Sequence, residues 1–271
     1  MRRWHRCLCI AILLGGCLLA ACSSVPITGR SQLNLVPADS MLSMSFQQYN
    51  QFLEQHQRSD DPEKLRRVRR VGRRIQEAVE TYFARRGQSG RLANYDWEFN
   101  LIESEEVNAW AMPGGKVVVY TGILPVAQNE AGLAVIMGHE IAHVVARHGN
   151  ERMSQAMLAQ FGSIALSQAM RDQPSQTRQL WMMAYGLGAQ VGLILPYSRL
   201  HEKEADHLGL VFMAMAGYDP REAVDFWQRM AEKKGSGASP PEFLSTHPAD
   251  QKRIAALRSF MPEAMKYYRE N

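Results

Sequence analysis

The sequence predicts an α+β fold, in which a mostly helical domain carries one small β-sheet. Apolar residues recur at helical spacing before residue 90 and after residue 128, and strand-like alternation lies between residues 95 and 124. No internal repeat interrupts this order. With 271 residues, the chain is long enough for one sizeable domain or two small ones.

The first 22 residues are typical of an export signal. Three arginines within the first six residues precede an apolar run, Leu8–Ala21, that is short for a membrane span. The run closes on Leu19-Ala20-Ala21-Cys22, which resembles a bacterial lipobox and implies cleavage before Cys22 and acylation of that residue. Ser23 in the next position favours the periplasmic face of the outer membrane. A plain secretory signal with a chance cysteine is the alternative.

Loss of this signal changes the cysteine and charge counts. Cys7, Cys9 and Cys17 leave with the signal and Cys22 carries the lipid, so the remaining domain has no thiol for a disulfide. The formal charge of +4 also shrinks, because 28 basic and 27 acidic residues remain without the signal arginines. A neutral domain in the envelope gives no indication of a nucleic-acid partner.

The segments before residue 125 predict a tether, two helices and a small sheet. Residues 22–37 are polar and contain prolines, which suits a lipidated tether. Helices are expected over residues 39–56 and 62–87. Residues 95–103 alternate as a strand does, and residues 108–124 form a pattern of strand, Pro-Gly-Gly turn and strand.

From residue 129 onward the pattern is helical. The expected helices cover residues 129–148, 150–170, 176–195, 198–216, 220–233 and 248–259. Residues 38–271 are therefore expected to form one domain that follows the signal, residues 1–21, and the tether.

Two segments raise the question of a membrane or nucleic-acid contact. Seven Lys and Arg residues crowd residues 64–74; they fit anionic lipid or nucleic acid, but the solvated face of an amphipathic helix explains them better. Residues 181–195 carry no charge, yet they are too short to cross a bilayer and Pro196 closes them. A buried or partly membrane-facing helix is the expectation there, and an inner-membrane span over residues 179–197 is the alternative.

Residues 137–149, MGHEIAHVVARHG, contain a pattern with clear chemistry. His139 and His143 lie four positions apart, so one helix face presents both imidazoles to one ion. Glu140 stands beside the first histidine, where its carboxylate takes a proton from a water that zinc activates. This is the His-Glu-x-x-His logic of metalloproteases, and Asn129 is a suitable cap for the helix. Chance in a chain with eight histidines is the alternative.

A third zinc ligand must come from elsewhere. His148 misses the spacing of a known extension of the motif, and it suits the C-terminal end of that helix. The downstream segment 198–210 places Glu202 and Asp206 one turn apart on one helix face. Glu202 is the candidate ligand, and Asp206 is the candidate to orient a ligating imidazole. A solvated acidic face is the alternative.

Five stretches give the chain a resemblance to a known family. They are NAWAMPGGKVVVYTGIL, HEIAH, SRLHEKEAD, AGYDP and STHPADQKRI, and they span residues 108–254. Together they resemble the zinc metallopeptidases that include HtpX and the CAAX prenyl endoproteases, and the tether looks like that of the small periplasmic lipoprotein members of the LoiP and YcaL type. The resemblance implies a zincin-like metalloprotease domain with one Zn²⁺ and a small sheet that borders the active-site cleft.

The resemblance also assigns roles at the metal. It implies that His139, His143 and Glu202 bind zinc. It implies that Glu140 is the general base and that Asp206 supports a ligand without touching the ion.

Further residues receive roles from the same resemblance. It implies that a strand with Asn108, Ala109 and Pro113 borders the cleft, where it could hold a substrate peptide by strand addition. His247 locally suits a helix start, whereas relatives suggest a reversible fourth zinc ligand that holds the enzyme inactive; both interpretations stay open. Arg253 is a weak candidate for assisting the oxyanion.

The implied function is hydrolysis of misfolded or unassembled envelope and outer-membrane proteins by a lipid-anchored zinc endopeptidase. The expected partners are these substrates, the membrane that holds Cys22 and the outer-membrane assembly machinery, without nucleic acid. A chaperone-like lipoprotein that binds unfolded outer-membrane proteins, with a structural or residual zinc site, is the alternative.

Overall fold

The computed structural model describes residues 22–268, apart from residue 27 and residues 237–240. The predicted signal lies outside the described residues and stays a prediction. The chain forms two compact units: Met1–Ala38 with Arg147–Tyr197, and Asp39–Ala146 with Ser198–Asn271. We call the first the hairpin unit and the second the sheet unit.

The sheet unit contains the small sheet that the sequence predicts, which confirms the α+β class. Its strands are β3 (Glu98–Ile102), β4 (Ala109–Met112) and β5 (Lys116–Tyr120), in the order β3-β5-β4. β5 runs parallel to β3 and antiparallel to β4. Gly114 and Gly115 join β4 to β5 at φ of 89° and 84°, a left-handed conformation that favours glycine. β4 is therefore an edge strand of this sheet.

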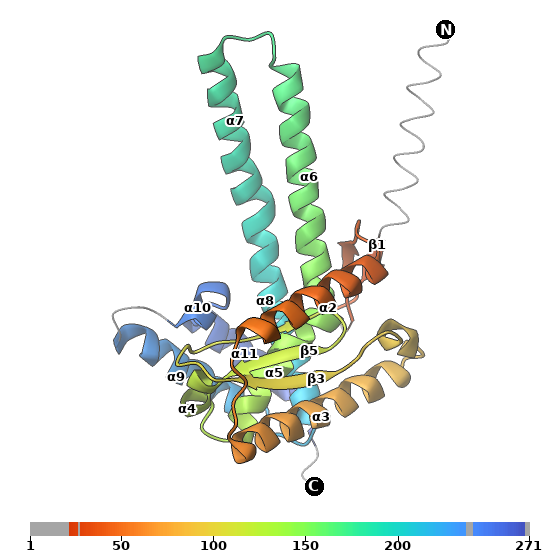
Figure 1. The fold of residues 1–271 in the computed structure, drawn as a ribbon, viewed down its shortest axis with the longest axis vertical. Helices are drawn as coiled ribbons and strands as arrows, with labels where there is room; N and C mark the ends of the chain where they lie inside the picture. The colour runs from red at the N-terminus through yellow and green to blue at the C-terminus, as the bar shows by residue number, and fades with distance from the viewer. Residues whose placement is uncertain (1–21, 27, 237–240, 269–271) are drawn as a thin grey trace. The chain divides into compact units, whose positions relative to one another are not determined.

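Helices make up most of the rest of the sheet unit (Figure 1). They are α2 (Ala38–Gln55), α3 (Pro62–Ala84), α4 (Leu124–Ala127), α5 (Glu130–Val145), α8 (Leu195–Met215, of which the sheet unit contains the part from Ser198 onward), α9 (Glu222–Ser236), α10 (Glu242–Thr246) and α11 (Gln251–Ala264). α3 packs against β3, where Gly72 lies so close to the Phe99 ring that a Cβ would collide with it. The Lys and Arg residues of α3 are not buried, as the predicted solvated face requires. α10 was not expected, because five residues give little periodicity.

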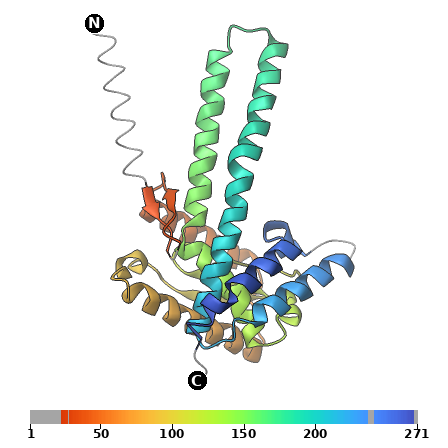
Figure 2. The same cartoon turned by 180° about the vertical axis from the view of Figure 1, so that it is seen from behind.

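The hairpin unit consists of a strand pair and two long helices. Its elements are β1 (Cys22–Ser24), β2 (Ser31–Leu33), α6 (His148–Ala169) and α7 (Ser175–Ala189), which continues as a π-helical segment (Gln190–Ile194). β1 and β2 pair in antiparallel fashion where the sequence predicts only a tether. Figure 1 and Figure 2 both show α6 and α7 side by side as an antiparallel pair.

Two predictions about this unit need correction. The sequence predicts His148 at the end of a helix, but α5 ends at Val145 and Arg147 adopts a left-handed φ of 60°, so His148 begins α6 instead. For residues 181–195, the expectation of a buried helix is wrong, because no residue of α7 is buried; the expectation of a partly membrane-facing helix stays a prediction. Among the described residues, no helix combines the length and the apolar character that crossing a bilayer requires.

Candidate metal centre

The helix that carries the His-Glu-x-x-His pattern runs through the interior of the sheet unit. Asn129 caps α5 as expected, since its Oδ1 accepts a hydrogen bond from the Gly132 amide at 2.8 Å. Every residue from Gly132 to Val145 is buried. A helix that is apolar on all sides can be buried on all sides, and this burial removes the polar residues of the pattern from water.

Four side chains from three segments converge at one point. His139 and His143 come from α5, Glu202 from α8, and His247 directly follows α10. One potential ligand atom from each lies within 4.8 Å of those of the others. His139 Nε2 lies 3.1 Å from His143 Nε2 and 3.1 Å from His247 Nδ1, and Glu202 Oε2 lies 2.8 Å from the same Nδ1. The structure thus brings together the three predicted ligands and the predicted fourth.

Two glycines allow the ligand helices to approach this closely. A Cβ on Gly138 of α5 would lie 3.1 Å from the Gly209 carbonyl oxygen of α8, and a Cβ on Gly209 would lie 3.0 Å from the His139 amide nitrogen. Both values are tighter than ordinary contacts, so larger side chains would force the helices apart. The backbone contact therefore sets the separation between His139 and the carboxylate of Glu202.

Behind His139, a carboxylate and a guanidinium form a second layer of contacts. Asp206 Oδ1 lies 3.0 Å from His139 Nδ1, as expected for a group that orients the imidazole. Arg253 donates to both oxygens of Asp206, through Nη2 at 2.6 Å and Nε at 2.9 Å. Its guanidinium lies 3.4 Å from the centroid of the Trp227 ring. Arg253 was expected only as a weak oxyanion candidate, and no local sequence signal indicates its contact with Asp206.

Glu140 lies beside the cluster without a hydrogen bond. Its Oε1 is buried and has no hydrogen-bond partner, although His247 Nε2 is 3.3 Å away. Burial raises the pKa of the Glu140 carboxyl above its ordinary value. A buried carboxylate oxygen normally has a hydrogen-bond partner. Because Glu140 Oε1 has none among the described residues, it can accept a proton from a molecule that binds beside it.

Hydrogen bonds within the cluster also shift the pKa values of Glu202 and His139. Burial opposes ionisation of Glu202, but hydrogen bonds with His139, His143 and His247 hold the pKa of its carboxyl far below the ordinary value. Burial would lower the pKa of His139, yet hydrogen bonds with Asp206 and Glu202 raise it to about 9. The surroundings of His139 therefore favour a positive charge at the cluster.

The donor set fits a zinc ion. Imidazole nitrogens and a carboxylate oxygen are ligands that Zn²⁺ prefers in four-coordinate sites. The facing Nε2 atoms of His139 and His143 also need a cation or a proton between them, because two imidazole lone pairs repel one another. His139, His143 and Glu202 would hold the ion, and His247 would complete the set.

The predicted substrate strand lies at the edge of the sheet. Ala109 begins β4, Asn108 immediately precedes it, and Pro113 follows its last residue. β4 packs against α5, and among the described strands it pairs only with β5. Ser45 Oγ donates to the Pro113 carbonyl at 2.6 Å, which fixes one end of the strand. The other edge of β4 pairs with no strand among the described residues, and Asn108 Oδ1 accepts a hydrogen bond from the Ala109 amide at 2.9 Å.

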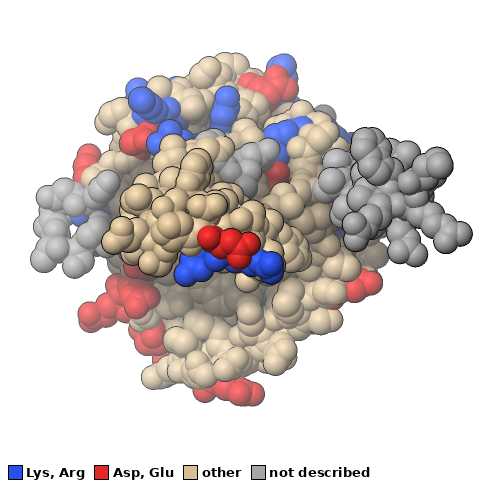
Figure 3. Space-filling view, turned by 90° about the horizontal axis from the view of Figure 1, so that it is seen from above, with Lys and Arg blue, Asp and Glu red and all other residues tan. Residues whose placement is uncertain are grey.

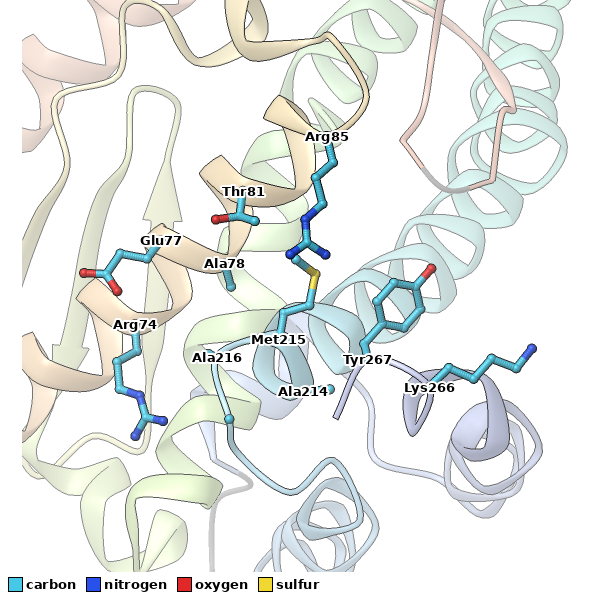
Figure 4. Close-up of a pocket in the computed structure, with 11 residues that line it drawn as sticks. Arg74, Glu77, Ala78, Thr81, Arg85, Ala214, Met215, Ala216, Lys266 and Tyr267 are labelled. Carbon is cyan, nitrogen blue, oxygen red and sulfur yellow. The ribbon is translucent and has the colours of Figure 1, made fainter. Parts of the chain in front are cut away.

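A pocket of about 430 Å³ lies apart from these residues (Figure 4). Residues of α3, the C-terminal end of α8 and the segment after α11 line it, among them Arg74, Glu77, Arg85 and Lys266. None of the four candidate metal ligands contributes to it. The pocket is thus no part of the metal centre.

Comparison with known proteins adds independent information. The sequence profile described as peptidase family M48 matches residues 69–261, a range that includes all four candidate ligands. The chain is similar to mitochondrial metalloendopeptidase OMA1 of Schizosaccharomyces pombe, with 37% identity over 64% of this chain and 49% of the relative. For OMA1 of Saccharomyces cerevisiae, the identity is 29% over 97% of this chain and 76% of the relative.

A bacterial protein gives a further match. The chain is 29% identical to the beta-barrel assembly-enhancing protease of Escherichia coli (strain K12), over 60% of this chain and 34% of the relative. The chain therefore spans about half the length of the first relative and about a third of this one. These proteins support the expected kind of metallopeptidase, but not the narrower likeness to HtpX and the CAAX prenyl endoproteases.

Proposed function

The chain belongs to peptidase family M48, and from this premise we propose that it is a zinc-dependent endopeptidase of the cell envelope. The observation that carries the proposal is the buried Glu140 Oε1, which lacks a hydrogen-bond partner beside four converging metal-ligand atoms. A carboxylate in this position is suited to accept a proton from a reactant.

Glu140, Asp206 and Arg253 each have a separate role in the proposed hydrolysis. When bound, zinc polarises the peptide carbonyl and makes an attacking water more acidic. Glu140 accepts the proton of this water and delivers it to the leaving amine, and burial helps by raising the pKa of its carboxyl. Asp206 accepts a hydrogen bond from His139 Nδ1 and so fixes which imidazole nitrogen faces the ion, while Arg253 holds Asp206 in place.

We assign substrate binding to the free edge of β4. A peptide that adds a strand there forms main-chain hydrogen bonds, which tolerate many side chains. Asn108, Ala109 and Pro113 mark this edge, and β4 packs on the helix that carries Glu140. Such a mode suits substrates that expose extended segments because they have not folded.

We further propose that the substrates are misfolded or unassembled envelope proteins, including outer-membrane proteins. The lipobox resemblance at Cys22 supports a lipid-anchored protein on the periplasmic face of the outer membrane. The name of the E. coli relative supports a link to β-barrel assembly and its machinery. Some relatives are named as mitochondrial, but the signal of this chain fits bacterial export, so we propose a bacterial envelope location for it.

His247 is proposed as a reversible inhibitory ligand. Its Nδ1 lies within 3.1 Å of His139 Nε2, and its Nε2 faces Glu140 Oε1 at 3.3 Å. An imidazole in this place occupies the space that the attacking water and the substrate carbonyl need. Movement of His247 away from the cluster would open the site.

Metal analysis combined with a degradation assay tests the proposed function. Purified wild type and Glu140→Gln are each expected to hold about one zinc ion per chain. Wild type should degrade an unfolded outer-membrane β-barrel protein, and Glu140→Gln should lose about 10²- to 10⁴-fold in rate. Glu80→Gln, an exposed residue of α3, is the matched control. A wild-type chain without zinc, or an active Glu140→Gln, would contradict the proposal.

A chaperone-like lipoprotein is the second candidate, because the free edge of β4 can bind an extended segment without cleaving it. The two candidates differ in the cell. Under the chaperone function, Glu140→Gln keeps its protective effect on outer-membrane assembly, whereas under the protease function the effect is lost.

A further inference from the structure

The helical pair α6 and α7 concentrates exposed apolar side chains. Of the eleven large apolar side chains exposed among the described residues, eight lie in α6 and α7, Val191 lies in the π-helical segment that follows α7, and Leu195 begins α8. The exposed fractions are 66% for Leu180, 56% for Trp181 and 63% for Leu187. Soluble proteins rarely leave such a group uncovered, so another surface is expected to cover it.

α6 and α7 pack against each other, and the exposed apolar side chains lie outside this contact. Tyr185 of α7 donates a hydrogen bond to the Ala159 carbonyl of α6 at 2.9 Å. The Tyr185 hydroxyl also lies against Gly162, where a Cβ would collide with it. The inner sides of the helices are thus occupied, and the outer sides carry the free apolar surface.

Charge is almost absent from this surface. Between Met153 and Ser198, the only charged residues are Arg171, Asp172 and Arg178. They lie in or near the turn that connects α6 to α7. In Figure 3, seen from above, one compact group of acidic and basic side chains lies on an otherwise tan area near the centre, and further charged groups lie toward the edges. A charge-poor apolar surface suits lipid, since an interface that forms with a soluble protein usually has a polar rim.

The candidate lipid anchor belongs to the same compact unit as these helices. β1, which contains Cys22, pairs with β2, and the residues around β2 are bonded to the start of α6. The Arg30 guanidinium contacts both carboxylate oxygens of Glu151, at 2.8 and 2.7 Å. The Leu35 amide donates to Ser154 Oγ at 2.8 Å. A bilayer that takes the acyl chains of Cys22 is therefore held within reach of α6 and α7.

We propose that the outer sides of α6 and α7 lie in the headgroup–acyl boundary of the bilayer to which Cys22 is attached. The choice of a lipid surface over a second copy of the chain rests on the acylation of Cys22 in the proposed function, and not on peptidase activity. Glutamines such as Gln160 and Gln179 interrupt the apolar residues, so the boundary suits the helices better than the hydrocarbon core. The 22 residues of α6 span about 33 Å, so contact along this length fixes the tilt of the hairpin unit on the membrane.

A site-specific fluorescence experiment tests this contact without the lipid anchor. In the full chain, Cys7, Cys9, Cys17 and Cys22 are replaced by serine, which leaves one introduced cysteine for a nitrobenzoxadiazole label. The label is placed in place of Leu187 on α7 or, as the control, of Glu232, which is exposed on α9. Zinc content is measured on each chain as a check of the folded metal centre.

Vesicles of phosphatidylethanolamine and phosphatidylglycerol should raise the emission of the Leu187 label about threefold or more and shift it to the blue, as transfer from water into an apolar environment does. Lipid brominated near the headgroup should quench it more than lipid brominated near the chain end. The Glu232 label should not respond. Replacing Leu180 and Trp181 by serine in the Leu187-labelled chain should remove most of the response.

Two results would overturn the inference. Equal responses of the Leu187 and Glu232 labels would show that α7 does not enter the lipid. A change at Leu187 that depends on protein concentration and occurs without vesicles would assign the surface to a second copy of the chain. Neither result bears on the zinc site. Acylation of Cys22 in the cell is measured separately by mass spectrometry, and its absence would remove the reason for choosing a lipid surface.

Discussion

The helices α5 and α7 are both rich in apolar residues, yet their surroundings are opposite. In α5, every residue from Gly132 to Val145 is buried, whereas in α7 no residue is. The polar side chains differ in the same way. In α5, His139, Glu140 and His143 are buried away from water, whereas the polar side chains of α7 are in contact with water. Apolar side chains of α5 therefore surround the candidate metal centre. In α7 it leaves a surface free for binding.

The largest expected effect follows from removing Glu202, the candidate zinc ligand from α8 that meets the histidines of the buried helix α5. Glu202→Gln should reduce the zinc content from about one ion per chain to near zero and abolish proteolysis, because a neutral amide binds zinc poorly. Atomic emission spectroscopy on the purified protein measures this change. Lys203→Gln, one position away and exposed, should keep both zinc and activity. Retention of zinc by Glu202→Gln would remove this residue from the ligand set.

The comparison itself can be tested with one type of substitution in both helices. Leu133→Ala in α5, where the side chain is fully buried, should lower the free energy of unfolding by about 2–5 kcal/mol. Leu187→Ala in α7 should change it by no more than about 0.5 kcal/mol, because the side chain is 63% exposed. Chemical denaturation followed by circular dichroism measures both. Similar losses in the two variants would mean that α7 is covered in solution.

A smaller effect is expected from the carboxylate behind His139. Asp206→Asn keeps the size of the side chain but weakens its bonds to the imidazole and to Arg253, so zinc affinity should fall about 10- to 100-fold. Competition with a fluorescent zinc chelator measures the affinity. Asp225→Asn, on the exposed side of α9, is the control. An unchanged zinc affinity would show that Asp206 only supports packing.

The smallest effect concerns His247, the proposed fourth ligand. If His247 blocks the site half of the time, His247→Ala should raise the rate of degradation of an unfolded substrate about twofold, the reciprocal of the open fraction. The exposed His56→Ala serves for comparison. Unchanged or lower turnover in His247→Ala would argue against a blocking role.

The sequence predicted most elements of the sheet unit and the residues that converge as candidate ligands, because these follow from local patterns. Asn129 caps α5 as expected, and the helix-face argument selected Glu202 and Asp206, which lie beside His139. The contact of Arg253 with Asp206 was missed, since it joins residues 47 positions apart. The exposure of α7 was also missed, because periodicity describes the faces of a helix and not what covers them.

The proposed ligand set also has a mechanical consequence for the folded chain. His143 and Glu202 are 59 positions apart, and α6 and α7 lie between them in the sequence. An ion that joins them closes this loop as a disulfide would, in a chain that has no cysteine after residue 22. By the loop-entropy relation for cross-links, such a closure is worth about 4 kcal/mol of stability. The zinc ion would thus act as a cross-link as well as a catalyst. A chelator would lower the stability of the folded chain as well as stop the reaction.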